Sequence, residues 1–365
     1  AAFALQKRGL RVIMCEADSQ LAQKASGNRY GLIMPYITDR QSPFERTYSR
    51  GFSFTRELLL SQFNSSGLLH QSGGLQLPST QRLKRLLESE STINAPTPLE
   101  KVCSEKATQL AGVEIPSCAF YAPEAGFVSP RQLVAEMTKG EIEVLASERV
   151  VELEQTGSGW RALLASARCV ESPVAVICGA HESRTLAHAS ALPLEPVRGQ
   201  TLLLAPTAAS AKLKTLVCFD GYVTPIPGDT NMHLHLLGAH YRHDDLRSET
   251  LESDSDEILH RCSAWLPGLF KPDAAPTSAR VCFRTSTIDR LPYVGALLDF
   301  AAMREEAKRF QSGTDVISKV PAVSLPGLYV SVGHGSRGLM SCPMSGEIIA
   351  RLATNAALGD LVEVA

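Results

Sequence analysis

A glycine-rich segment near the C-terminus, GHGSRGLMSCP at 333–343, has the residue types from which a site for a flat ligand is built. It follows an apolar run and precedes a stretch with helical spacing. Glycine and serine let the backbone approach a planar group closely. The N-terminus of the next helix offers unpaired N–H groups and the positive end of its dipole. This arrangement is suited to a ring that gains negative charge on reduction; an ordinary glycine-rich turn is the alternative.

Arg284 begins a second polar segment, RTSTIDRLPYVG at 284–295. A planar guanidinium binds a carboxylate through two charge-assisted hydrogen bonds, which would fix the C–H bond presented for reaction. A structural ion pair between Arg284 and Asp289 is the alternative. Tyr222 and Tyr241 have hydroxyls suited to binding a carboxylate or an amine, although aromatic residues on inner strand faces are more often core.

Four histidines precede two aspartates at 233–245. Alternate strand residues share a face, so His233 and His235 satisfy part of a metal-site pattern. No fitting third ligand is evident, and we expect no metal.

The N-terminal residues read as half of a dinucleotide-binding unit. A helix over 1–9 ends at Gly9, an apolar strand follows at 10–15, and Glu16 and Asp18 come next. In a βαβ unit, an acid at this strand end accepts hydrogen bonds from the adenosine ribose; a generic α/β unit is equally compatible. The first strand and its GxGxxG loop would precede Ala1, and we expect this chain to lack them.

Other elements follow from periodicity and turn residues. Helices are expected at 45–63, 81–90, after Ser129-Pro130, and at 252–265, 300–310 and 344–357. Strands are expected at 73–78, 142–153, 160–166, 174–178 and 327–332, and several more within 200–240. The run at 174–178 is apolar throughout and is expected to be buried on both faces. Residues 91–123 read as irregular.

Composition limits the function classes. The 365 residues have a net charge of −2, so overall charge does not favour RNA binding. No run of eighteen apolar residues occurs, which excludes a membrane-spanning helix in this sequence. The nine cysteines contain no CxxC pair, which favours a reducing compartment and predicts the cytoplasm. Arg304, Lys308 and Arg309 have helical spacing and are expected to form a solvated helix face; tRNA contact is the minority interpretation.

Seven ordered segments resemble the D-amino-acid-oxidase-like flavoprotein superfamily, and within it the C-terminal oxidase domain of bifunctional tRNA wobble-uridine enzymes. They are ASGNRYG (25–31), GFVSP (126–130), RGQ (198–200), CFDGYVTP (218–225), GAHY (238–241), RTSTIDRLPYVG (284–295) and GSRGL (335–339). The resemblance implies an α/β fold (α+β overall), with a discontinuous Rossmann-like FAD-binding domain and an inserted antiparallel substrate domain. It implies FAD-binding segments at 1–45, 124–190 and 280–365, and substrate-binding segments at 46–123 and 191–279.

The resemblance also implies roles for individual residues. The expected contacts with FAD are made by Glu16, Ser26, Gly27, Asn28, Val150, Gly179, Ala180, Gly333, Gly335, Ser336, Arg337, Gly338 and Leu339. Arg284 matches the arginine that binds the substrate carboxylate, and Tyr222, Tyr241 and Arg337 are further candidates for the catalytic site. Relatives of glycine-oxidase type have their second arginine one residue earlier, where this chain has Ser336.

The implied substrate is tRNA with a carboxymethylaminomethyl group on its wobble uridine. FAD-dependent oxidation would release glyoxylate and leave an aminomethyl group. A separate methyltransferase domain using S-adenosylmethionine, which these residues do not encode, would then methylate the product. Two alternatives are an oxidase of a small free amino acid such as glycine or sarcosine, and a non-catalytic remnant without the FAD pyrophosphate loop.

Overall fold

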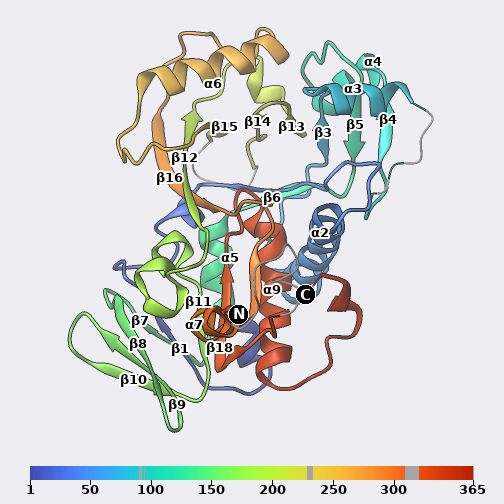
Figure 1. Ribbon diagram of the computed structural model, residues 1–365. Coiled ribbons are helices and arrows are strands. Elements are labelled where there is room, and N and C mark those ends of the chain that lie inside the picture. The colour runs from blue at the N-terminus through green and yellow to red at the C-terminus, as the bar shows by residue number, and fades with distance from the viewer. Residues whose placement is uncertain (90–92, 94, 228–232, 309–319, 365) are drawn as a thin grey trace.

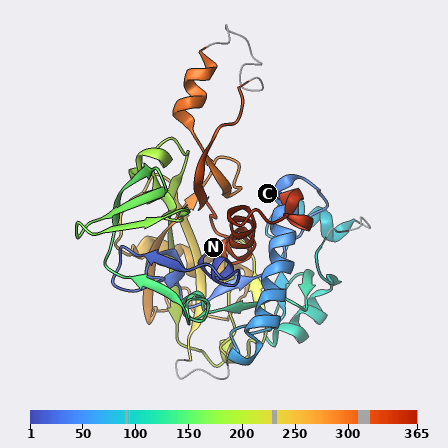
Figure 2. The ribbon, with the colours of Figure 1, turned by 90° about the horizontal axis from the view of Figure 1, so that it is seen from below.

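The computed structural model describes residues 1–89, 93, 95–227, 233–308 and 320–364. One part of the molecule consists of a large sheet and the helices that pack on it. The other part consists of smaller sheets and two long helices (Figure 1). Figure 2 shows the same arrangement from below, with helix α7 (Phe300–Ala307) standing clear of the body.

The N-terminal segment begins with helix α1 (Ala2–Gln6). Gly9 has a φ of +77°, a left-handed conformation that ends a helix at little cost for glycine. Strand β1 (Val12–Cys15) follows and pairs in parallel with β7 (Ile142–Leu145), with Val12 opposite Ile142. The expected helix–glycine–strand order is therefore present, with shorter elements than expected.

A three-stranded sheet carries the C-terminal turn. Strand β18 (Ser324–Val332) pairs in parallel with β11 (Ala175–Ile177) and antiparallel with β17 (Tyr293–Leu298). The prediction that 174–178 is buried on both faces is wrong: Ile177 alone of this run is buried, because β11 is the edge strand.

Two long helices pack beside this sheet. Helix α9 (Gly338–Ala353) follows the glycine-rich turn directly, six residues earlier than predicted. It packs against α2 (Pro43–Gln62), where Thr55 donates a hydrogen bond to the Leu339 carbonyl at 3.0 Å. Ser42 and Glu45 form a capping box at the start of α2.

The predicted strand at 142–153 is two strands, because the chain turns between them. Strand β8 (Val150–Thr156) forms an antiparallel meander with β9 (Gly159–Leu164) and β10 (Cys169–Ser172). Trp160 donates a hydrogen bond to the Pro326 carbonyl at 2.9 Å and so ties the meander to β18. Helix α5 (Pro130–Met137) begins at the predicted Ser129 cap.

The large sheet has eight strands in the order β16-β12-β15-β14-β13-β3-β5-β4. Their bounds are β16 Ser278–Ser286, β12 Glu195–Leu204, β15 His235–Arg242, β14 Tyr222–Val223, β13 Leu216–Cys218, β3 Gly74–Gln76, β5 Ala119–Ala122 and β4 Glu100–Val102. All neighbouring pairs are antiparallel except β13–β3.

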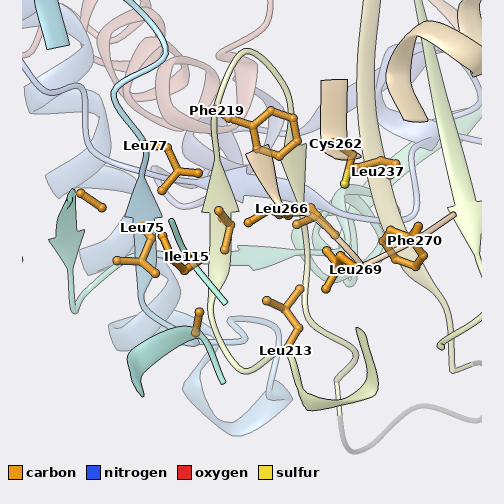
Figure 3. Close-up of a cluster of buried hydrophobic side chains, with 14 of the residues drawn as sticks. Leu75, Leu77, Ile115, Leu213, Phe219, Leu237, Cys262, Leu266, Leu269 and Phe270 are labelled. Carbon is orange, nitrogen blue, oxygen red and sulfur yellow. The ribbon is translucent and has the colours of Figure 1, made fainter. Parts of the chain in front are cut away.

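Helices α6 (Glu252–Trp265) and α4 (Ser104–Ala111) contribute to the core against this sheet. Figure 3 shows Leu75 of β3, Leu237 of β15 and leucines of the connecting segments gathered with Phe219, Cys262 and Phe270 there. The prediction that 91–123 is irregular is wrong, because β4, α4 and β5 lie within it. Helix α3 (Gln81–Glu88) was expected, and Thr80 caps it. No described helix is both long and apolar enough to cross a bilayer.

Candidate active site

A cavity of about 1070 Å³ extends between the two parts of the molecule. It runs from α1 and α9 past the 25–37 loop to strands β15 and β16. It is lined by many of the predicted cofactor and substrate residues, namely Ser26, Asn28, Tyr222, Tyr241, Arg284, Gly335, Ser336, Arg337, Gly338 and Leu339. The predicted residues Glu16, Gly27, Val150, Gly179, Ala180 and Gly333 are outside this lining.

The turn after β18 has the geometry of a cradle for a flat ring. Gly333 and Gly335 have φ values of +79° and +55°, which glycine adopts at little cost. Helix α9 starts three residues later, so its first N–H groups, which have no partner within the helix, are on the cavity side. A Cβ on Gly31 would come within 2.2 Å of the Leu339 side chain. Close backbone packing and a free helix N-terminus fit a flavin ring.

Arg280 anchors the 23–28 loop, a role that sequence analysis missed. Its Nη1 donates to Asn28 Oδ1 at 2.8 Å, and its Nη2 donates to the carbonyls of Gln23 and Lys24 at 2.6 Å. A Cβ on Gly27 would lie 2.4 Å from Nη2. The glycine in this loop thus makes room for the arginine, and the anchoring guanidinium comes from β16, which also carries Arg284.

The residues expected near the adenosine end are outside the cavity lining. Glu16 accepts a hydrogen bond from the Asp18 amide at 2.9 Å, as an acid does when it caps a turn. Ala180 has a φ of +54°, and the next amide, that of His181, donates to Thr285. Strand β8 begins at Val150.

Arg284 and Tyr241 meet across one face of the large sheet. Tyr241 pairs with Gly199, and Gly199 pairs with Cys282, two residues before Arg284. Because glycine leaves the intervening space open, the Arg284 guanidinium lies over the Tyr241 ring, 4.3 Å from its centroid. Burial opposes the charge on Arg284, but the Tyr241 and Tyr222 hydroxyls outweigh that effect and raise its pKa.

Arg284 has no carboxylate partner among the described residues. Asp289, the alternative partner, instead accepts hydrogen bonds from Thr287 at 3.2 Å and from the Leu291 amide at 3.0 Å. Burial raises the pKa of Tyr222 well above its ordinary value, so this tyrosine remains a neutral hydroxyl. The end of the cavity is therefore cationic and open to an anionic group.

Arg337 also lines the cavity, at the start of α9. Its guanidinium carbon lies 4.9, 5.3 and 5.6 Å from the ring centroids of Tyr36, Tyr48 and Phe44, respectively. Burial lowers the pKa of Arg337 and raises that of Tyr48 to about 12. Sequence analysis found the arginine but not the aromatic rings around it.

On the face of strands β12 and β15 that points away from Arg284, polar side chains form a network in which the charges are paired within the protein. This set is called the closed network. Arg198 and Asp254 are both fully buried and form an ion pair. Arg242 donates to the other oxygen of Asp254, with its Nε at 2.8 Å. The Arg198 Nε donates to the Arg247 carbonyl at 2.8 Å, and Gln200 binds the Leu251 carbonyl at 2.8 Å. The RGQ segment therefore joins β12 to α6.

The histidine-rich segment belongs largely to this structural framework. His240 lies 3.3 Å from Asp254 and 3.0 Å from Glu257. His235 is buried and hydrogen-bonded to the Thr224 carbonyl at 2.8 Å, and burial lowers its pKa. Within the described parts of the chain, no group of three His, Cys, Asp or Glu side chains is arranged to hold a metal ion.

Comparison with known proteins places this geometry in a family. The family model "DAO: FAD dependent oxidoreductase" matches residues 1–352. A relative from Pseudomonas paraeruginosa, the "tRNA 5-methylaminomethyl-2-thiouridine biosynthesis bifunctional protein MnmC", is 33% identical over 357 residues, which cover 96% of this chain and 54% of that protein. The protein of the same name from Methylobacillus flagellatus is 32% identical over 95% of this chain and 53% of its own length. The chain therefore spans about half the length of these curated relatives.

Solved structures have the same fold at low identity. Glycine oxidase from Geobacillus kaustophilus superposes with a TM-score of 0.74 at 19% identity, covering 100% of this chain and 94% of that one. Iminodiacetate oxidase from Chelativorans sp. BNC1 has a TM-score of 0.73 at 17% identity, covering 98% and 92% of the respective chains.

These findings confirm the predicted fold class, the resemblance to the oxidase region of the bifunctional enzymes, and FAD as the cofactor. The chain belongs to the DAO family of FAD-dependent oxidoreductases.

Proposed function

We propose that this chain is the oxidase part of a tRNA-modifying enzyme. It removes the carboxymethyl group from carboxymethylaminomethyl-(2-thio)uridine at the wobble position and leaves aminomethyluridine and glyoxylate. The observation that carries this proposal is Arg284, which lines the cavity with Tyr241 and has no carboxylate partner among the residues that the structure describes. The chain is also 33% identical to a protein of tRNA 5-methylaminomethyl-2-thiouridine biosynthesis.

The chemistry of the substrate fits the cationic end of the cavity. Its side group is an N-substituted glycine, with one carboxylate, one secondary amine and a CH₂ between them. Arg284 would bind the carboxylate through two hydrogen bonds and so hold the CH₂ in one orientation. The Tyr222 hydroxyl, kept neutral by burial, would accept or donate a hydrogen bond at the amine.

Bound FAD supplies the acceptor for the two electrons of the CH₂ C–H bond. Loss of that hydride and of the amine N–H proton forms a C=N bond between the former CH₂ carbon and the nitrogen. Water adds to this carbon and the C–N bond breaks, which releases glyoxylate and the aminomethyl group. The first amides of α9 would stabilise negative charge at the adjacent ring edge.

We assign the cofactor to the cradle and its neighbouring loop. Ser26, Gly27, Asn28 and the backbone of the turn residues Gly333, Gly335, Ser336, Arg337, Gly338 and Leu339 would lie along FAD. Glu16, Val150, Gly179 and Ala180 would lie toward its adenosine. Residues 1–45, 124–190 and 280–365 would form the FAD-binding domain, and residues 46–123 and 191–279 the substrate domain.

The relatives' additional length supports a second, linked activity. Because these relatives are named as bifunctional proteins, we propose that S-adenosylmethionine-dependent methylation of the aminomethyl product follows oxidation. We further propose the cytoplasm, where tRNA is found, as its location.

A free amino acid is the second candidate substrate. Glycine oxidase and iminodiacetate oxidase superpose over nearly the whole chain, and Arg284 would bind a free glycine equally well. The two functions differ in what the rest of the cavity must hold.

The test uses the full protein that contains this chain. It is incubated with tRNA carrying the carboxymethylaminomethyl group, and separately with glycine and N-methylglycine, while glyoxylate and the nucleoside mass are measured. We expect oxidation of the tRNA, and a loss of about 10³-fold or more in Arg284→Ala with flavin absorbance unchanged. Arg304→Ala, in the exposed helix α7, is the matched control. Turnover of the free amines with none of the tRNA would contradict the proposal.

A further inference from the structure

Arg337 differs from most half-buried arginines of this protein because its side chain has no polar partner in the described part of the chain. Among the described residues, no hydrogen bond or ion pair engages its guanidinium, which contacts three aromatic rings instead. Several other half-buried arginines have a partner: Arg8 binds Glu347, Arg56 binds Glu124, Arg82 binds the Ile37 carbonyl and Arg280 binds Asn28. A half-buried guanidinium that lines a cavity and has no protein acceptor can donate its N–H groups to a ligand.

The aromatic rings hold this guanidinium in place. Tyr48 is nearly fully buried, and its hydroxyl donates to the Arg290 carbonyl at 2.8 Å. Phe44 packs edge-on against both neighbours, with centroids 5.3 Å from Tyr36 and 4.8 Å from Tyr48. Tyr36, Phe44 and Tyr48 together form an aromatic cage beside the guanidinium. Because the cage provides no hydrogen-bond acceptor to the guanidinium, it fixes the position of Arg337 without satisfying its donors.

Arg337 and Arg284 line the same cavity. The Tyr241 hydroxyl interacts electrostatically with both guanidinium groups, and all three residues line the cavity. Arg284 alone is enough for one carboxylate. The Arg337 guanidinium in the same cavity is therefore available to a second group that carries hydrogen-bond acceptors.

We propose that Arg337 and the aromatic cage form a nucleobase subsite, in which the guanidinium donates hydrogen bonds to a carbonyl oxygen of the pyrimidine ring. This inference rests on the proposed function. A pyrimidine is flat and carries acceptor oxygens at its edge, and planar guanidinium groups are suited to such edges. Bases also stack on aromatic side chains and arginine planes in RNA recognition. A free amino acid would reach Arg284 only, so this subsite separates a nucleotide substrate from glycine.

The test compares two arginines that contact the same ring. Arg82 also lies over Tyr36, 5.3 Å from its centroid, and lines the same cavity, but its Nη1 already donates to the Ile37 carbonyl at 2.7 Å. Full protein is prepared as wild type, Arg337→Met, Arg337→Lys and Arg82→Met. KM and kcat are measured with 5-carboxymethylaminomethyluridine as the free nucleoside, and N-methylglycine serves as a competing ligand.

We expect Arg337→Met to raise KM for the nucleoside by about tenfold or more, with kcat within about threefold and the flavin spectrum unchanged. The inhibition constant of N-methylglycine should stay the same, since that ligand does not reach the cage. Arg337→Lys should raise KM by less, because charge remains but the planar donor pair is lost. Arg82→Met should change KM by less than about twofold.

Two results would overturn the nucleobase subsite and a third would contradict the proposed function, and the measurements distinguish them. An unchanged KM in Arg337→Met, with a wild type that oxidises the nucleoside, would overturn the subsite and leave the function intact. Equal weakening of nucleoside and N-methylglycine would also overturn the subsite, since Arg337 would then serve the common carboxylate or the structure. A wild type that oxidises N-methylglycine but neither the nucleoside nor modified tRNA would contradict the function itself. Arg337→Lys keeps the test valid if Arg337→Met does not fold.

Discussion

Two arginines on adjacent strands of the large sheet have opposite surroundings. In the pairing of β12 with β16, Arg198 is opposite Phe283 and Arg284 is opposite Val197, so the two are in neighbouring rows. Successive residues of a strand point to opposite faces, which sends Arg198 toward α6 and Arg284 into the cavity. A shift of one residue along the strands therefore places Arg198 in a structural network and leaves Arg284 available to a ligand.

The two arginines differ in whether the protein supplies the partners of the guanidinium group. Arg198 is fully buried, is paired with Asp254 and donates to the carbonyls of Arg247 and Glu249. Arg284 has the Tyr241 ring and no carboxylate among the described residues. A buried charge that the protein neutralises contributes to a unique structure, whereas one that it leaves open is available to bind an anion. This contrast can be tested by mutation on each face.

The largest effect should come from removing the carboxylate of the closed network. Asp254→Ala leaves the fully buried Arg198 without its anion and Arg242 without its partner. Breaking one side of a buried pair costs about 3–5 kcal/mol, so we expect a loss of that size in the free energy of unfolding. Urea unfolding of the full protein measures it. Glu143→Ala, which breaks the exposed pair with Arg11, should cost less than about 0.5 kcal/mol. Similar losses in both variants would mean that the network is not structural.

Arg280, the other arginine of β16, should show an intermediate effect, which is on cofactor affinity. Arg280 shares its face with Arg284 but donates three hydrogen bonds to the 23–28 loop. Arg280→Ala should free that loop, which we assign to FAD, and weaken FAD binding by about 2 kcal/mol, or about thirtyfold. Flavin retention after gel filtration and titration of the stripped protein with FAD measure this. Arg304→Ala should retain wild-type affinity. If Arg280→Ala binds FAD normally while Arg284→Ala loses it, the assignment of these two arginines is reversed.

The sequence predicted the arginines better than their surroundings. Arg284 and Arg337 are candidates from the sequence because motif order and residue type are visible locally, and the helix predicted at 252–265 has the same bounds in the structure. The closed network was missed because Arg198 and Asp254 are far apart in the chain, and the aromatic cage because α2 meets the start of α9 only in the fold.

Short elements were also hard to predict. Strands β4 and β5 have three and four residues and lie in a segment rich in proline and serine. They are too short to show the alternation of apolar and polar residues that predicts a strand. Their pairing comes from the sheet, through contacts such as Glu100 opposite Tyr121. Tertiary context decides such strands more than local sequence does.

The smallest expected effect tests the contrast between Arg198 and Arg284 most directly. Replacing each arginine by methionine should change the free energy of unfolding in opposite directions. Arg284→Met removes a half-buried cation that has no anionic partner in the described parts of the chain and replaces it with an apolar side chain of similar length. Apolar replacement of buried charges is often neutral or stabilising, so the ligand-free protein should unfold with a free energy equal to wild type or about 1 kcal/mol higher. Arg198→Met, measured by the same urea titration, should instead be destabilised, because Asp254 and two carbonyls lose their donor. If both substitutions destabilise equally, the protein itself satisfies Arg284, and the cationic end of the cavity is part of the scaffold instead of a site for a carboxylate.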